Sequence, residues 1–137
     1  MNLLLEIITP EKVVYKDEVQ EVIAPTVDGE IAILPNHINL LTQINPGELI
    51  VRKGSINHSI AITGGFLEVS NNKVSIVANY AIKAQDIEVA RAQEAKKRAE
   101  KIMNEKTTDN ELRMAQAEMI KAILELKVAT KHKRRLR

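Results

Sequence analysis

Glycine and proline, the residues that most often mark tight turns and interrupt helices, are confined to one part of this chain. All four prolines and all five glycines lie within the first 65 of its 137 residues. Frequent turn residues with short runs between them favour short strands, whereas a long stretch without either residue permits long helices. We therefore expect two architectures in succession, with domains at residues 1–84 and 85–137.

The first part of the chain has the alternation that is typical of strands. Ile56, His58, Ile60 and Ile62 alternate with smaller or more polar residues. Turn signals recur at short intervals and no helical period separates them, which predicts an antiparallel β-sandwich rather than a parallel βαβ sheet. The expected strands cover residues 2–8, 18–24, 30–34, 40–44, 47–52, 56–62, 65–69 and 73–78.

From Asp86 onward the apolar residues follow a helical period. A capping box, Thr108-Asp109-Asn110-Glu111, predicts the start of a second helix, where the Thr108 hydroxyl accepts from the Glu111 backbone N–H and the Glu111 carboxylate reaches back. A short polar link at about residues 104–107 would join the two helices into an antiparallel hairpin, so the fold class is α+β. The seam positions, three or four residues apart, are Ala92, Ala95, Ala99 and Ile102, then Leu112, Ala115, Met119, Ala122, Leu126 and Ala129.

The first seam is mostly alanine, so the helices can approach closely but bury little area. Burial stabilises by roughly 25 cal/mol per Å² of apolar surface, and small side chains offer little of it. We expect the hairpin to be marginally stable on its own and able to change position.

Several function classes lack their characteristic residues in this sequence. The chain has no cysteine, and no glycine-rich phosphate loop is present. The three histidines, His37, His58 and His132, are far apart, so no metal site is expected. No nucleophile, base and orienting group can be assembled, so the chain is not expected to be an enzyme by itself.

Charge and hydropathy indicate how the chain meets its surroundings. Residues 1–85 carry nine acids and six bases, whereas residues 86–137 carry nine acids and fourteen bases. No window approaches the roughly 20 apolar residues of a membrane helix. We expect a soluble chain with a mildly acidic first part and a basic second part, and any membrane association would go through a partner.

Three ordered segments carry a family resemblance: Gly29-Glu30-Ile31-Ala32-Ile33-Leu34-Pro35-Asn36-His37, then Gly64-Gly65-Phe66-Leu67-Glu68-Val69, then Asp86-Ile87-Glu88-Val89-Ala90-Arg91-Ala92. Together they resemble the epsilon subunit of F-type ATP synthases, up to about Leu126. The resemblance implies a non-catalytic central-stalk subunit whose sandwich binds the gamma subunit and the ring of membrane c subunits, coupling rotation to ATP synthesis. It implies that the hairpin can extend into the catalytic alpha/beta head and inhibit ATP hydrolysis. It also implies a peripheral location on the cytoplasmic face of a bacterial plasma membrane.

The resemblance makes two residues in the first domain candidates for partner contact. His37 could contact a partner or sense pH, although a histidine that only fixes its loop is the simpler interpretation. Glu30 is otherwise an ordinary exposed carboxylate. The resemblance implies that Glu30 and His37 lie on a loop that faces the membrane ring.

A nucleotide-binding motif of some bacterial epsilon subunits is matched in part by Ile87, Glu88, Arg91 and Ala92, with Arg98 two turns further on. The family motif has Asp where this chain has Glu88, and Glu125 would put negative charge where a phosphate needs positive charge. The alternative is an i,i+3 ion pair between Glu88 and Arg91. No cofactor is expected, and regulatory ATP is the one nucleotide that the resemblance suggests.

The second helix carries a surplus of positive charge. Its basic end, from Lys131 to Arg137, could bind nucleic acid as a stand-alone module, with salt-dependent affinity. The only aromatic residues, Tyr15, Phe66 and Tyr80, are far from this end, so it has no stacking platform. We favour an acidic protein partner, contacted by Arg113, Lys121, Lys127, Lys131, Arg134 and Arg135.

Overall fold

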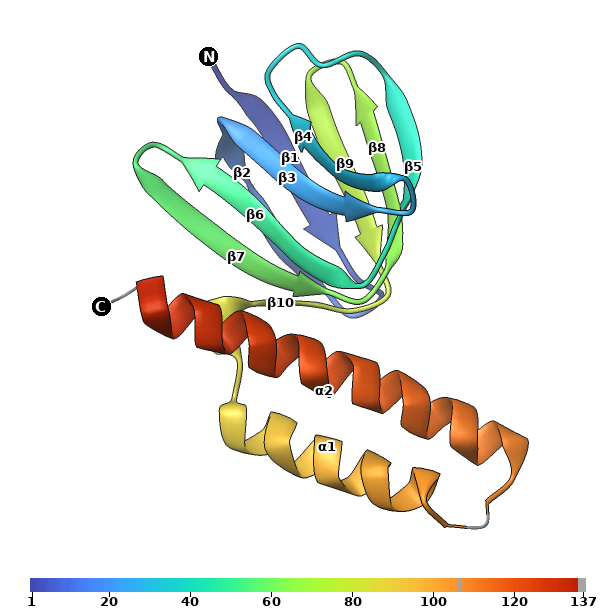
Figure 1. Cartoon of the computed structure of the whole chain (residues 1–137). Coiled ribbons are helices and arrows are strands. Elements are labelled where there is room, and N and C mark those ends of the chain that lie inside the picture. The colour runs from blue at the N-terminus through green and yellow to red at the C-terminus, as the bar shows by residue number, and fades with distance from the viewer. Residues whose placement is uncertain (106, 136–137) are drawn as a thin grey trace. The chain divides into compact units, whose positions relative to one another are not determined.

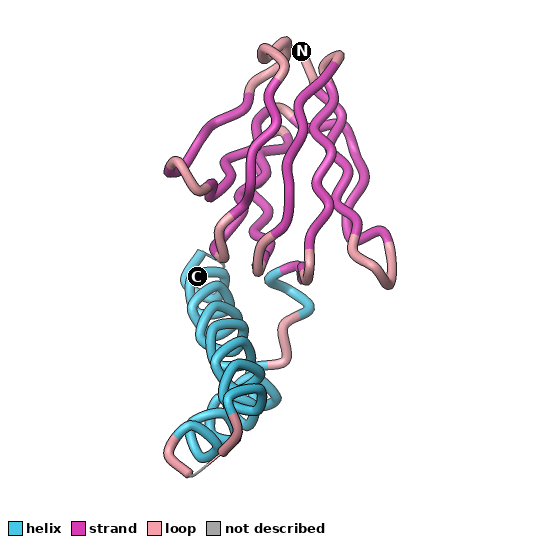
Figure 2. The backbone as a smooth tube through the Cα atoms, turned by 90° about the vertical axis from the view of Figure 1, so that its right-hand side faces the viewer, coloured by secondary structure: helices cyan, strands magenta, loops and turns pink. Residues whose placement is uncertain are grey.

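The computed structural model describes residues 1–105 and 107–135 and divides the chain into two compact units, Met1–Lys83 and Ala84–Arg137 (Figure 1). The strands belong to the first unit and the α-helices to the second (Figure 2). Two predictions extend beyond the described residues, because the link at 104–107 includes Lys106 and the basic end includes Leu136 and Arg137.

The first unit is a β-sandwich, as predicted. The order of neighbouring strands is β10-β7-β6-β3-β5-β8-β9-β1-β2, and β4 pairs with β3. One bridge, Thr26 to Ile44, links β3 to β5 where the path passes from one layer to the other (Figure 1). The strands are β1 (Leu3–Ile8), β2 (Val13–Val19), β3 (Glu21–Thr26), β4 (Gly29–Ile33), β5 (Leu40–Ile44), β6 (Gly47–Lys53), β7 (Ile56–Ile62), β8 (Gly65–Ser70), β9 (Lys73–Ala78) and β10 (Ala81–Lys83).

Three details of the sheet differ from the prediction. The strand expected at 18–24 covers only the end of β2 and most of β3, and residues 13–17 of β2 were not predicted as strand. The two strands are separate because Val19 and Val22 are both buried, and a single strand would put residues three apart on opposite faces. The short β10 was also not predicted. Finally, β1 and β9 pair in parallel, which the long chain connection between them permits, whereas the other pairs are antiparallel.

The core lies between the two layers of the sandwich. Alternate residues of β1, β8 and β9 point into it, and the period of two decides which side chain of each strand is buried. The second half of β7 departs from the predicted alternation, because Ser59 and Ala61 are buried as well as Ile60 and Ile62. The Ser59 hydroxyl donates to the Glu48 carboxylate at 2.8 Å.

Side chains link β2, one end strand of this path, to β10, β7 and β6. The Lys83 ammonium lies 5.8 Å from the centroid of the Tyr15 ring, which is 6.3 Å from the His58 ring. Lys53 of β6 donates a hydrogen bond to Asp17 of β2 and forms an ion pair with it. We call these five residues the clasp, because they close the sheet where no backbone ladder does.

The second unit is the predicted pair of helices. After a short 3₁₀ turn, η1 (Ala84–Asp86), α1 (Val89–Met103) packs against α2 (Asp109–Arg135). The helix expected to open at Asp86 begins later, because Glu88 has extended backbone angles and makes no side-chain cap. In the seam, Ala92, Ala99, Ala115 and Ala122 are buried, and the other predicted seam residues are half-buried.

The capping box at the start of α2 forms only in part. The Glu111 N–H donates to the Thr108 hydroxyl oxygen at 3.1 Å, as expected. The Glu111 carboxylate, however, accepts a hydrogen bond from the hydroxyl of Thr107 rather than reaching back to the Thr108 backbone. One residue further upstream therefore supplies the second half of the cap.

Candidate functional site

The outer face of the β5-β8-β9-β1-β2 layer carries a row of apolar side chains. In the strand register Phe66 lies opposite Val77, Val77 beside Ile8, and Ile8 opposite Val13. Phe66, Val77 and Val13 are 58%, 54% and 55% exposed, and Ile8 is half-buried. We call these four residues the apolar row. A contiguous exposed apolar strip across four strands is typical of a surface that binds a partner.

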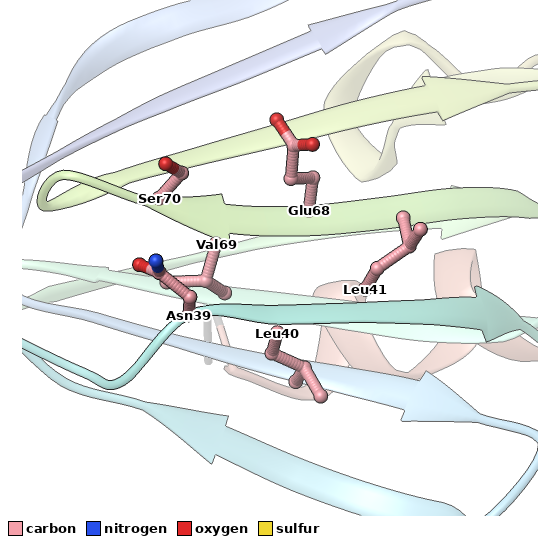
Figure 3. A pocket seen from close by; sticks show the side chains of 6 residues that line it. All are labelled: Asn39, Leu40, Leu41, Glu68, Val69 and Ser70. Carbon is pink, nitrogen blue, oxygen red and sulfur yellow. The ribbon is translucent and has the colours of Figure 1, made fainter.

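The next row along the same strands is mixed. Leu41, 70% exposed, lies opposite Glu68, and Glu68 lies opposite Ser75. Figure 3 shows Leu41 and Glu68 side by side on one side of β5 and β8, with Leu40 and Val69 on the other. A hollow of about 300 Å³ opens here, and Asn39 and Ser70 also line it.

The local sequence explains why these side chains face outward. Gly64 and Gly65 have φ angles of 138° and 135°, which favour glycine, and they lead the chain into β8. From there the period of two buries Leu67 and Val69, and so turns Phe66 and Glu68 outward.

The apolar row was not predicted from the sequence, although a signal was present. Each member has an apolar neighbour in the sequence that is buried: Ile7 beside Ile8, Val14 beside Val13, Leu67 beside Phe66 and Ile76 beside Val77. In a strand, two adjacent residues cannot both face one core. When two adjacent residues of a strand are both apolar, one of them faces away from the core. That outward residue is a candidate for burial against a partner.

The structure does not bring Glu30 and His37 into one loop. Glu30 is the second residue of β4, next to the β3–β4 turn, and His37 follows the opposite end of that strand. The His37 Nδ1 lies 2.7 Å from the Ile38 carbonyl oxygen, and the Asn36 N–H donates to Asn72 at 2.8 Å. These contacts fix the loop, and Ile38 at 79% exposed is its most prominent apolar residue.

The residues of the partial nucleotide motif lie just before α1 and within it. Ile87 and Glu88 precede α1, and Ala92 is buried in the seam. The Arg91 guanidinium lies 3.7 Å from the Glu88 carboxylate, and both groups are largely exposed. Glu88 and Arg91 form the i,i+3 ion pair, and the Ala92 backbone N–H donates to the Glu88 carbonyl oxygen at 3.1 Å.

The basic residues predicted on the second helix all lie in α2. Lys121 is half-buried, whereas Arg113, Lys127, Lys131, Arg134 and Arg135 are exposed. The last turn of the helix is basic, with His132 and Lys133 besides the two arginines. Positive charge at this end is favourable because the helix dipole places partial negative charge there.

Other kinds of site find no support among the described residues. Within residues 1–105 and 107–135, no three His, Asp or Glu side chains gather as metal ligands would. None of the helices described there is both long and apolar enough to cross a bilayer.

The fold and its surfaces define a class, a β-sandwich with an exposed apolar row followed by a basic helical hairpin. Comparison with known families identifies the family to which the chain belongs. Residues 2–84 match the model of the ATP synthase delta/epsilon chain beta-sandwich domain, and residues 85–130 match the long alpha-helix domain of the same chain. The chain belongs to the epsilon chain family of F-type ATP synthases.

Relatives agree with this assignment, and solved structures share the fold. The ATP synthase epsilon chain of Desulforamulus reducens is 42% identical over 125 residues, covering 91% of this chain and 95% of the relative. That of Dehalococcoides mccartyi strain BAV1 is 42% identical over 134 residues, covering 97% and 96%. By fold alone, the chain resembles a chain of the Euglena gracilis mitochondrial ATP synthase (TM-score 0.66, 20% identity, covering 99% of this chain and 82% of that one). A central-stalk/c-ring structure from Tetrahymena thermophila gives a TM-score of 0.60 at 18% identity, covering 92% and 95%.

Proposed function

We propose that the chain is a non-catalytic central-stalk subunit of a proton-translocating F-type ATP synthase. In this role it couples rotation of the gamma subunit and the membrane ring to ATP synthesis. The observation that carries the proposal is the match of both units, in order, to the two consecutive domains of one family over residues 2–130. Its location is then peripheral, on the cytoplasmic face of a bacterial plasma membrane, as part of the complex.

The sandwich is the docking unit in this proposal. The apolar row and Leu41 form the surface that binds the gamma subunit, because their exposed area is removed from water only when a partner covers it. Glu30 and His37 serve the contact with the membrane c ring. Glu30 and His37 lie at opposite ends of β4. They would therefore contact the c ring, or the c ring and a subunit next to it, at two separate points.

The hairpin is the regulatory unit. Its seam is mostly buried alanine, which holds the two helices together with little apolar area. A small stabilisation of one arrangement is what allows a partner to favour another. The exposed cations of α2 would then face an acidic surface of the catalytic head and slow ATP hydrolysis, and ATP bound near Arg91 and Arg98 would be a regulatory ligand.

Co-purification tests the proposal most simply. The tagged chain, expressed in its host and recovered from detergent-solubilised membranes, should bring the gamma subunit, the catalytic subunits and the c ring in fixed ratio. Phe66→Ser should reduce this recovery, because it places a polar group in the middle of the docking face. Recovery of the chain without any ATP synthase subunit, or retention on nucleic acid instead, would contradict the proposal.

A further inference from the structure

Glu68 is an exposed carboxylate in the mixed row that runs beside the apolar row. We propose that it selects the partner by charge, and that the stalk subunit covering the apolar row presents a lysine or arginine to it. This inference rests on the proposed function, because it names the chemistry of the surface that the sandwich docks on.

The register places Glu68 where a partner cannot avoid it. Leu41, 70% exposed, lies directly opposite Glu68 on β5. Phe66 is two residues earlier on the same strand and faces the same side, roughly 7 Å away along the strand. A partner that covers both Leu41 and Phe66 therefore also meets the carboxylate that adjoins them both.

The hollow beside Glu68 gives the partner side chain a place to enter. It has a volume of about 300 Å³ and is lined by Asn39, Leu41, Glu68 and Ser70 along its outward side (Figure 3). A long side chain such as Lys or Arg can lay its methylene groups against Leu41 while its charged head reaches the Glu68 carboxylate. The amide of Asn39 and the hydroxyl of Ser70 offer further polar partners at the rim.

Among residues 1–105 and 107–135, Glu68 lacks the ion-pair partners that the other carboxylate of this row has. Glu6, on β1, has Lys73 at 3.5 Å and Lys16 at 3.8 Å. Within residues 1–105 and 107–135, Glu68 makes no ion pair and no hydrogen bond through its side chain. Burying an unpaired carboxylate is costly, so a partner that covers Glu68 must supply the compensating charge.

The strength of this selection comes from desolvation rather than from the pair in water. An exposed ion pair contributes little to binding, but removing one member of a buried pair leaves the other charge uncompensated. Each of the two charges, Glu68 and the cation on the partner, is then compensated only when the other is present. A surface without that cation is rejected even when its shape fits.

The test is equilibrium binding of the full chain to an ATP synthase complex depleted of its own epsilon subunit. Glu68→Gln keeps the shape of the side chain and removes its charge, and Glu68→Lys reverses the charge. Glu18→Gln is the matched control, because Glu18 is an exposed acid at the far edge of the same layer, on β2. Thermal melting of each free variant shows that the fold is kept, as expected for an exposed position.

We expect Glu68→Gln to weaken the Kd by roughly thirtyfold or more, and Glu68→Lys to abolish measurable binding. The Kd of the unmodified chain should also rise more steeply with salt than that of Glu68→Gln, while Glu18→Gln follows the unmodified chain. Equal affinities for the unmodified chain and Glu68→Gln would overturn the inference while leaving the proposed function intact. Failure of the unmodified chain to bind at all would overturn the proposed function, and this inference with it.

Discussion

Asp17 and Lys53 stabilise the clasp through a contact that depends on pH. The hydrogen bond from Lys53, helped by the Glu18 backbone N–H, lowers the pKa of the Asp17 carboxyl below its ordinary value of 3.8. The hydrogen bond to Asp17 in turn raises the pKa of Lys53 above 10.5. The contribution of Asp17 to stability is therefore fully present above pH 3.8 and is lost as the pH falls through its lower folded-state pKa.

We predict that Asp17→Asn lowers the melting temperature at neutral pH and that this deficit shrinks as the medium is acidified below the ordinary carboxyl pKa. At alkaline pH the deficit should shrink again, because Lys53 loses its proton above its raised pKa. Melting curves of the unmodified chain and of Asp17→Asn across the pH range measure this deficit. A deficit that stays constant from acid to alkaline pH would show that the ion pair does not stabilise the clasp.

Gly65 is the glycine whose replacement should cost most. Its φ is 135°, and a Cβ at this position would lie 2.0 Å from the Val77 carbonyl oxygen on the neighbouring strand. We predict that Gly65→Ala destabilises the sandwich by about 3 kcal/mol or more, because both backbone strain and a steric clash oppose it. Gly29 also has a positive φ, but nothing lies within 4 Å of its Cβ position. Gly29→Ala should therefore cost only about 1 kcal/mol. Denaturant unfolding measures both, and equal costs would contradict this account of Gly65.

At the scale of elements, the seam between α1 and α2 is too narrow for larger side chains. Ala99 is fully buried in it, whereas Ala90, on the same helix, is exposed. We predict that Ala99→Ile destabilises the hairpin by about 1–3 kcal/mol because it overpacks the seam. Ala90→Ile should cost only a few tenths of a kcal/mol, through lower helix propensity. The loss of helical circular dichroism on heating compares the two, and equal melting of both variants would show that Ala99 is not a tight contact.

The elements that the sequence predicted well are those with a strong period or a specific turn. The seam alanines, the Thr108 cap and the strand at residues 73–78 are set by local chemistry, and the structure has them. The bend at Gln20 was missed because it breaks the period of two by a single residue between Val19 and Val22. The three-residue β10 was missed because so short a segment carries no period at all.

The candidate site likewise has features that the sequence predicts and features that depend on how the strands pair. The resemblance directed attention to Glu30, His37 and the motif around Arg91, yet strand pairing separates the first two by the length of β4. The docking face depends on which strands become neighbours, such as β8 with both β5 and β9. Apolar doublets in the sequence show that some residue must face outward, but only the register places Phe66 beside Val77.

For the whole molecule, we propose that docking and regulation belong to different units of one chain. The sandwich has its own core of buried side chains, all of them within residues 1–83. A chain ending after Ala84 should therefore melt cooperatively as a β-rich protein, and it should still join the complex through the apolar row. A truncated product that aggregates, or that melts without a transition, would contradict the separation of the units.

Several cations of α2 acting together, rather than one, should produce the regulation. A single exposed pair contributes about 0–1 kcal/mol, so replacing Lys127 alone with alanine should change ATP hydrolysis little. Replacing four or more of the exposed cations should release hydrolysis, because the summed contribution is what shifts a two-state equilibrium.

The most direct measurement is ATP hydrolysis by the reconstituted ATP synthase complex, with the full chain and with the chain that ends after Ala84. Binding of both chains is quantified in the same preparations, so that a rate difference cannot come from a missing subunit. We expect equal incorporation of both chains, a higher hydrolysis rate with the truncated chain, and little change in ATP synthesis. Equal hydrolysis rates with both chains fully bound would contradict this expectation, because the hairpin would then not regulate the enzyme.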